Sequence, residues 1–407
     1  MARRAVQGVP NVIGVTRARL AEAGIELTDM TDTNPTRHGL FDPEVLAIVA
    51  DHTYQAARYE PTPRGPWPAR AALADRYGGD PEDYWLTAST SEAYGWLFTL
   101  LADPGDAIAI PSPGYPLIEP LARLQSLATR SYRTFYAHPA GWEVDRSSLT
   151  TVLGEESVRA LVAVHPNNPT GAFADPSLID LAAAHEVPLI ADEVFFPFRV
   201  SVRRPDSAVD PQLRNDATVM RDLPSRTTNT YPGRLSGNET VLTFGLDGLS
   251  KSLAAPQLKL GWIRLSGPVS NKEPIAHALD EIADTYLSVN SPVALALPDL
   301  LTLADSTVAR VTTRLTNNLT SAAELFGDLR IRTTYGGWMM LLDVPPIMDA
   351  EALCVALMER AGLYVHPGYF YDLPDSTLAI SLLPDEDQFR ESCVRLMAGL
   401  TIFADEQ

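Results

Sequence analysis

The stretch that decides the fold is residues 250–262, which read SKSLAAPQLKLGW and contain Lys251. The chain has only three lysines, at positions 251, 259 and 272, against 29 arginines, so arginine is its usual cation. A position that keeps lysine in such a chain is a candidate for chemistry that needs a primary amine. Apolar residues at 241–244 precede the stretch, and we therefore expect Lys251 to follow a buried strand.

Short apolar runs alternate with helical patterns on the N-terminal side of this stretch as well. We expect buried strands at 107–111, 161–165, 188–191, 241–244 and 260–265, with helices such as 91–102 and 175–185 between them. This alternation predicts an α/β fold in which helices cover a mostly parallel sheet. In such sheets, ligands bind at the carboxyl ends of the strands.

Two regions differ from this pattern. Residues 200–240 are rich in Arg, Pro, Asp and Thr without periodicity, which predicts a surface insertion. From residue 291 a helical pattern runs to 326, and a strand at 336–343 is followed by helix, strand and helix. We therefore predict a large domain over residues 45–290 and a smaller α+β domain made of residues 1–44 and 291–407.

Composition narrows the classes of partner. The formal net charge of −19 argues against nucleic acid or an anionic membrane as the main partner. No uninterrupted apolar stretch reaches membrane-spanning length, and no apolar run follows the basic N-terminus. Cys354 and Cys393 lack metal-ligand spacing, so we predict reduced core thiols and no metal site. These features are typical of a cytoplasmic protein.

Two further motifs accompany the lysine stretch. Residues 164–171 read VHPNNPTG and residues 190–195 read IADEVF, and each follows an apolar strand. In this order, the three segments resemble the asparagine turn, the aspartate motif and the Schiff-base lysine segment of the class I/II aminotransferases. The resemblance covers nearly the whole chain. It implies the α/β fold of type I PLP-dependent transferases, with pyridoxal 5'-phosphate (PLP) as cofactor.

The resemblance also implies a role for each matching residue. Lys251 would form the internal aldimine and move the Cα proton, Asp192 would pair with the pyridinium nitrogen, and Asn168 would donate to the ring 3'-oxygen. The other implied cofactor contacts are Ser89 and Thr90 at a helix start, Ser250 and Lys259 at the phosphate, Tyr115 stacked on the ring, and Tyr59 at the phosphate of a neighbouring subunit. The last contact implies a homodimer with shared active sites.

Three positions depart from the family pattern. Phe195 replaces a tyrosine whose hydroxyl meets the ring oxygen, a loss of about 1 kcal/mol. Lys259 replaces an arginine at the phosphate. Ala379 replaces an arginine that grips the substrate α-carboxylate, a contact worth about 1.5–3 kcal/mol.

Other residues are therefore candidates for the substrate. Asn34 and Arg37 lie in the N-terminal segment that covers the active site in the family, and Arg64 is a further candidate. We expect His165 and His366, which adjoin motifs, to make local hydrogen bonds rather than to act in catalysis.

Three functions are compatible with these residues. The first is a PLP-dependent aminotransferase acting on a small-molecule amine, an amino acid or an amino-acid conjugate. The second is a PLP-dependent lyase, or a decarboxylating or oxidative enzyme of the same fold in specialised metabolism, for example one that performs β-elimination on a cysteine S-conjugate. The third is a non-catalytic PLP-binding module.

Overall fold

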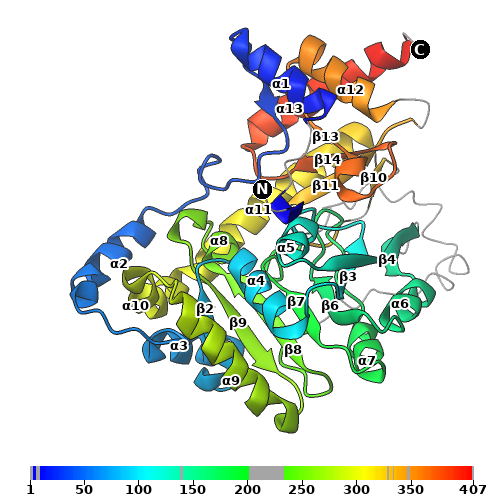
Figure 1. Cartoon of the computed structure of the whole chain (residues 1–407). Coiled ribbons are helices and arrows are strands. Elements are labelled where there is room, and N and C mark those ends of the chain that lie inside the picture. Colours follow the sequence, from blue (N-terminus) through cyan, green and yellow to red (C-terminus); the bar gives the residue numbers. More distant parts are fainter. Residues whose placement is uncertain are drawn as a thin grey trace, which may run out of the picture.

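The computed structural model describes residues 3–5, 10–137, 141–200, 233–327, 330–332, 334–345 and 349–405. Its centre is an eight-stranded sheet (Figure 1). In spatial order the strands are β2 (Tyr84–Thr87), β9 (Gly261–Ser266), β8 (Thr243–Gly248), β7 (Leu189–Asp192), β6 (Val158–Val164), β3 (Ala107–Ser112), β4 (Ala128–Ala137) and β5 (Gly141–Val144).

The five strands from β8 to β4 run parallel to one another, whereas β9 is antiparallel to both of its neighbours and β5 is antiparallel to β4. Every residue of β7 and of β8 is buried, as expected of strands with helices on both faces. The predicted mostly parallel sheet is confirmed.

Helices cover both faces of this sheet. One apolar cluster joins it to α4 (Thr90–Leu101), α5 (Ile118–Leu124) and α9 (Val269–Tyr286). A second cluster, on other side chains of the same strands, joins it to α6 (Arg146–Leu153) and α7 (Ser177–Ala184). A third packs α2 (Glu44–Thr53), α3 (Trp67–Tyr77) and α10 (Ser291–Leu300) against β2, β9 and the short helix α8 (Leu249–Ser252). Because α8 contains Lys251, this third cluster fixes the backbone that carries the amine.

The smaller part of the molecule contains two further sheets. A four-stranded sheet has the order β10 (Ile331–Arg332), β11 (Met339–Asp343), β14 (Thr377–Ser381) and β13 (His366–Pro367). In a two-stranded sheet, β1 (Thr28–Asp29) pairs with β12 (Leu363–Tyr364). Around them pack α1 (Val12–Glu22), α11 (Ala304–Phe326), α12 (Ala350–Ala356) and α13 (Glu386–Asp405). The N-terminal helix α1 therefore lies among C-terminal elements, as Figure 1 shows.

The helical run from 291 to 326 consists of α10, a short turn at Leu301–Leu303, and α11. Among the described helices it alone meets the length and composition of a membrane span, and 44% of its most apolar window is buried in the fold. The packing of α10 on α2 and α3, and of α11 on α13, accounts for its apolar side chains. The domain boundary that we predict at 290 stays a prediction, and this packing favours one nearer 303.

The prediction of a surface insertion at 200–240 is wrong for its described end, residues 233–240, which includes buried residues. Residues 201–232 lie outside the described residues. Leu235 is 1% exposed, and Ser236 is buried as well. The backbone N–H of Leu235 donates to Glu193 Oε1 at 2.7 Å. The end of the segment is therefore part of the interior, because it supplies partners to a buried carboxylate.

The side chain of Asn318 ties α11 to the end of β14, and its replacement should lower stability. Its Nδ2 donates to the carbonyls of Leu382 and Pro384 at 2.9 and 2.8 Å, and the residue is fully buried. We expect Asn318→Leu to reduce the free energy of unfolding by about 1–3 kcal/mol, because it leaves two buried carbonyls without donors. The midpoint of urea unfolding measures this loss.

The adjacent Asn317 provides the matched control, because its amide bonds to Glu386 at the surface. Asn317→Leu should change the unfolding free energy by less than about 0.5 kcal/mol. Equal losses in the two variants would contradict the assignment.

Candidate active site

Sheet register brings Lys251 and Asp192 together. Asp192 is the last residue of β7 and pairs with Leu246 of the parallel strand β8. The chain leaves β8 at Gly248 and enters α8, where Lys251 is the third residue. Both side chains therefore belong to the edge of the sheet where ligands of α/β folds bind.

The Asp192 carboxylate is almost fully enclosed, with the residue 4% exposed. Tyr94 donates its hydroxyl to Oδ2 at 3.0 Å, and the backbone N–H of Val194 donates to Oδ1 at 3.3 Å. Burial, aided by the charge of Asp247, raises the pKa of Asp192 to about 6, although both hydrogen bonds and Lys251 oppose that rise. The carboxylate is therefore ionised at neutral pH and directed by two donors.

The amine of Lys251 lies over aromatic faces. Its Nζ is 4.5 Å from the centre of the Trp338 ring and 5.2 Å from that of Phe195. These two rings pack edge to face, 5.5 Å apart. Desolvation lowers the pKa of Lys251 to about 8, against the attraction of Asp192. An amine with this pKa is available as a nucleophile and as a proton carrier near neutral pH.

A buried group of charges lies behind Asp192. Arg234 donates to Glu193 Oε2 and to Asp247 Oδ2, each at 2.9 Å. Glu193 is 1% exposed and Asp247 is 3% exposed. Two carboxylates therefore share one guanidinium beside the Asp192 carboxylate, and burial raises the pKa of Asp247 to about 6. Removal of Arg234 would leave both carboxylates uncompensated.

Asn168 and Tyr115 lie near Asp192. Asn168 follows β6, beside β7, and its Oδ1 is buried without a hydrogen-bond partner among the described residues. Burial, together with the negative charge of Asp192, raises the pKa of the Tyr115 hydroxyl. Both residues line a cavity of about 390 Å³, together with Met339, the neighbour in sequence of the Trp338 ring that lies at the Lys251 amine.

The predicted phosphate contacts converge through strand pairing. Thr87 at the end of β2 and Gly248 at the end of β8 both pair with Gly261 of β9. A Cβ on Gly261 would lie 3.3 Å from the carbonyl carbon of Ser89, so glycine allows β9 to approach the start of α4. This pairing places Ser89 and Thr90, at the N-terminus of a 12-residue helix, near Ser250 and the exposed Lys259.

Four predicted residues stand apart from this group. Tyr59 is 70% exposed, and the contact predicted for it needs a second subunit. Asn34 accepts hydrogen bonds from Thr36, and Arg37, with its side chain 70% exposed, pairs with Asp32 at 3.2 Å. Arg64 donates to both carboxylate oxygens of Asp280 in α9, each at 2.6 Å, so its guanidinium is paired within the protein.

Two histidines make the local hydrogen bonds that the sequence predicts. His165 accepts from the backbone N–H of Ala174 through Nδ1, and its Nε2 contacts the carbonyl of Gly233. His366 contacts the Tyr371 hydroxyl through Nδ1 at 2.9 Å. However, His366 and Tyr371 also line the cavity, which the sequence analysis does not predict.

Several other site residues are missed by the sequence. Tyr94, Trp338 and Arg234 contact the predicted residues from elements that no motif marks. In the sequence these three residues differ from their neighbours only in being aromatic or charged, and residues of that kind are too common to indicate a site.

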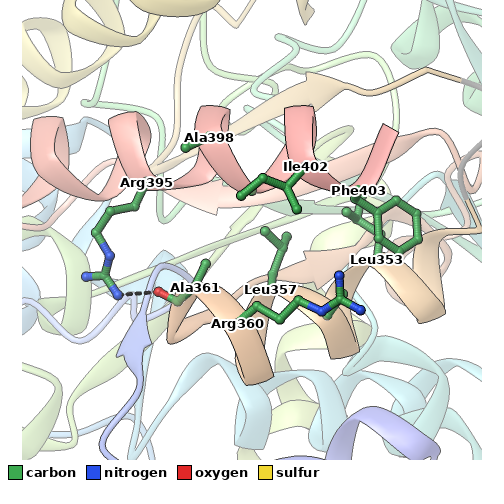
Figure 2. A pocket seen from close by; sticks show the side chains of 10 residues that line it. Leu353, Leu357, Arg360, Ala361, Arg395, Ala398, Ile402 and Phe403 are labelled. Carbon is green, nitrogen blue, oxygen red and sulfur yellow. Dashed lines mark hydrogen bonds between the residues drawn. The ribbon is translucent and has the colours of Figure 1, made fainter. Parts of the chain in front are cut away.

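A second cavity, of about 280 Å³, lies in the smaller part of the molecule (Figure 2). It is formed by α12, the helical turn Leu357–Ala361 and α13, and Arg395 at its edge donates to the carbonyl of Ala361. Its lining is apolar apart from Arg360 and Arg395 and contains no acid or nucleophile. The candidate chemistry therefore belongs to the cavity at Asn168.

Known proteins resemble this chain over most of its length. The family model for aminotransferase class I and II matches residues 55–396. Alanine aminotransferase of Mycobacterium tuberculosis is 27% identical over 291 residues, which cover 69% of this chain and 61% of that protein. S-alkyl-thiohydroximate lyase SUR1 of Arabidopsis thaliana is 28% identical over 250 residues, covering 58% and 48% respectively. This chain therefore spans less than two thirds of the length of these curated relatives.

The fold also matches solved structures. Alanine aminotransferase from Pyrococcus furiosus superposes with a TM-score of 0.81 at 20% identity, covering 99% of this chain and 100% of that one. At this level of identity, the likeness establishes a shared fold. The predicted type I fold is thereby confirmed.

Members of the matched family depend on PLP, and the residues present here fit that cofactor. The donor set includes an amine, an ionised buried carboxylate and a helix N-terminus suited to phosphate. Among the described residues, the buried Oδ1 of Asn168 has no hydrogen-bond partner, so the amide of Asn168 is available to a ligand. The site therefore has a partner for the ring nitrogen, the aldehyde and the phosphate.

The scarcity of lysine makes the lowered pKa of Lys251 directly measurable. Reductive methylation with 13C-formaldehyde labels three lysines and the N-terminal amine. We expect the NMR signal of Lys251, identified by its absence from Lys251→Arg, to titrate with a midpoint near pH 8, because desolvation disfavours the ammonium form. A midpoint above pH 10 would show that the amine is solvated.

Proposed function

Because the chain belongs to the aminotransferase class I and II family, we propose that it is a PLP-dependent aminotransferase whose cofactor is attached to Lys251. One observation carries the proposal. The lysine amine and the buried, doubly hydrogen-bonded Asp192 carboxylate share the ligand-binding edge of the sheet. The reaction would transfer the amino group of a small molecule to a keto acid.

Each residue then has a distinct task. When bound, the cofactor supplies an electron sink for negative charge at the carbon that bears the amine. Asp192 would accept a hydrogen bond from the protonated ring nitrogen, and Tyr94 and Val194 hold its carboxylate in place. Lys251 Nζ, whose pKa is lowered to about 8, would carry the proton that leaves the substrate Cα.

The remaining contacts orient the cofactor. Asn168 would donate its amide to the ring oxygen, and Phe195 would supply an apolar edge there without a hydroxyl. Tyr115 would pack on the ring face. Ser89, Thr90, Ser250 and Lys259 would bind the phosphate.

A second candidate function is supported by the likeness to SUR1, which is named a lyase. The same amine and carboxylate would serve an elimination, because the proton at Cα is removed in both reactions. A cysteine S-conjugate would lose its sulfur group, giving a thiol, pyruvate and ammonia after addition of water. Relatives named alanine aminotransferase favour transfer over elimination.

We also propose a homodimer with shared active sites. Tyr54, Tyr59 and Trp67 are 89%, 70% and 59% exposed and lie on α3 and the segment between α2 and α3. Clustered exposed aromatic residues mark protein interfaces. In this arrangement, Tyr59 reaches the phosphate of the other subunit. The cytoplasmic location stays a prediction.

The proposal is tested by loading the protein with PLP and screening amino donors. Borohydride reduction should leave a pyridoxyl group on Lys251, detectable by mass spectrometry, because its amine is the one that faces Asp192. A productive donor should convert the cofactor to pyridoxamine 5'-phosphate, and a keto acid should reverse that conversion. Lys251→Ala should lose at least about 10³-fold in rate, since it removes both the attachment point and the proton carrier.

Lys272→Ala is the matched control, because Lys272 forms an ion pair with Asp83 and is not among the residues that we place at the cofactor. Reduction that labels Lys259 or Lys272 in place of Lys251 would contradict the attachment. Pyruvate and ammonia released without any keto acid would establish elimination instead.

The dimer is tested by charge placed on the exposed aromatic surface. Trp67→Glu should shift the protein to monomers in sedimentation velocity, because an unpaired charge would be buried in the contact. Phe135→Glu changes another exposed aromatic, on β4 near the opposite edge of the sheet, and should leave the dimer intact. A wild-type protein that sediments as a monomer would refute the proposal.

A further inference from the structure

Trp338 places a buried aromatic ring against the Lys251 amine. The Nζ atom of Lys251 lies 4.5 Å from the centre of that ring. Trp338 is 1% exposed, and it packs edge to face on Phe195 and Phe198, with ring centres 5.5 and 5.2 Å apart. The indole therefore lies between two apolar rings and the amine that is the proposed attachment point of the cofactor.

The backbone around Trp338 is held from two sides. The N–H of Gly337 donates to the carbonyl of Phe198, in the segment that follows β7, at 3.2 Å. The N–H of Leu382, which follows β14, donates to the carbonyl of Trp338 at 2.8 Å. These bonds hold the indole where the segment after β7 meets the segment after β14, so its place beside Lys251 is set by both sheets.

The indole N–H of Trp338 is buried without a hydrogen-bond acceptor among the described residues. An indole nitrogen can only donate, and a buried donor without an acceptor costs about 1–3 kcal/mol. None of its three side-chain contacts, with Phe195, Phe198 and Lys251, brings an oxygen atom. A molecule bound at the site is therefore the expected source of the acceptor.

A missing acceptor does not mark a site by itself. The buried indole N–H groups of Trp96 and Trp142 also lack an acceptor among the described residues. Trp338 differs from both because its ring lies at the amine of Lys251. The combination of an unpartnered donor and contact with a reactive amine is what points to a ligand.

Attachment of the cofactor would bring an oxygen to this donor. The ring oxygen of PLP is on the carbon next to the one that bears the aldehyde, so it lies beside Nζ once Nζ is joined to that aldehyde. A substrate amine takes the place of Nζ there, and a carboxylate on its carbon comes to the same region. Both sources supply an anionic oxygen, which is the stronger kind of acceptor for an N–H group.

We propose that the indole N–H of Trp338 donates to an anionic oxygen beside Lys251 Nζ, carried either by the cofactor ring or by the carboxylate of the substrate. Trp338 is then a further binding residue of the site, and the same ring covers the amine. The inference rests on the proposed aminotransferase function, because it requires the cofactor on Lys251.

Trp338→Phe removes the N–H and keeps an aromatic ring. In the PLP-loaded protein, the absorbance of the attached cofactor reports the proton on the nitrogen that joins it to Lys251. Without a donor from Trp338, more of the negative charge of the ring oxygen acts on this proton, so the midpoint of the titration should rise by about 0.5–1 pH unit. Such a rise assigns the N–H to the cofactor oxygen.

Binding of propanoate tests the other source. Propanoate has a carboxylate but neither an amine nor a keto group, so it does not react. If the N–H serves the substrate, Trp338→Phe should weaken propanoate binding about two- to tenfold in isothermal titration calorimetry and leave the titration midpoint unchanged.

Trp96→Phe is the matched control. Trp96 is 2% exposed and its N–H also lacks an acceptor among the described residues, but its ring packs on Tyr286 at the end of α9. We expect this variant to keep the parent midpoint and the parent affinity for propanoate. If Trp338→Phe changes neither quantity more than Trp96→Phe does, the proposal is overturned.

Borohydride reduction separates this inference from the function on which it rests. Labelling of another lysine in place of Lys251 refutes both, because the anionic oxygen would then lie elsewhere. Labelling of Lys251 together with no specific effect of Trp338→Phe refutes the role of Trp338 and leaves the proposed function intact.

The N–H itself can be followed by NMR. The six tryptophans give six indole 1H–15N signals, and that of Trp338 is the one absent from Trp338→Phe. It should move downfield when PLP is attached or when propanoate is then added, because the N–H gains an anionic acceptor. If Trp338→Phe does not fold, Trp338→3-benzothienylalanine replaces it throughout, since sulfur takes the place of the N–H in a ring of the same shape. A Trp338 signal that stays in place through both additions overturns the proposal.

Discussion

Asp192 is an ionised carboxylate in the interior, and much of the site follows from keeping it there. Burial alone would favour its protonated form, as its raised pKa of about 6 indicates. Two donors, the Tyr94 hydroxyl and the Val194 backbone, offset that cost and leave the carboxylate charged at neutral pH. Its charge opposes the desolvation of Lys251, whose pKa falls only to about 8. The acid and the amine thus set each other's protonation.

The rigidity of this pair comes from the sheet. Asp192 and Lys251 follow neighbouring parallel strands whose register is fixed by buried side chains on both faces. Gly261 lets β9 approach Ser89, so the same sheet positions a residue that we expect to bind the phosphate. The pair is also supported from behind, where Arg234 neutralises part of the charge of Glu193 and Asp247.

Much of this arrangement can be predicted from the sequence, and the exceptions have a common cause. Asp192 and Asn168 each follow an apolar run, and such runs in a βαβ pattern place their ends on one edge. Tyr94 was not predictable, because it lies within a helix and meets a carboxylate 98 residues away. The polar composition around Arg234 predicts surface, whereas its contacts with two buried acids hold it in the interior. Such pairings depend on tertiary distance, which local patterns do not contain.

The active site has two parts with different electrostatics, and they come from different sheets. Strand ends of the eight-stranded sheet supply the amine, the charged carboxylate and the phosphate contacts. The four-stranded sheet supplies Met339 and His366 to the cavity lining, and both are uncharged at neutral pH. Because the charges needed for chemistry lie only in the first part, the second can change without altering proton transfer. Next to this lining, Ala379 is fully buried in a cluster on which Trp142 and Tyr371 pack. Side chains of this sheet can therefore change without displacing the Lys251 amine or the Asp192 carboxylate, which belong to the other sheet.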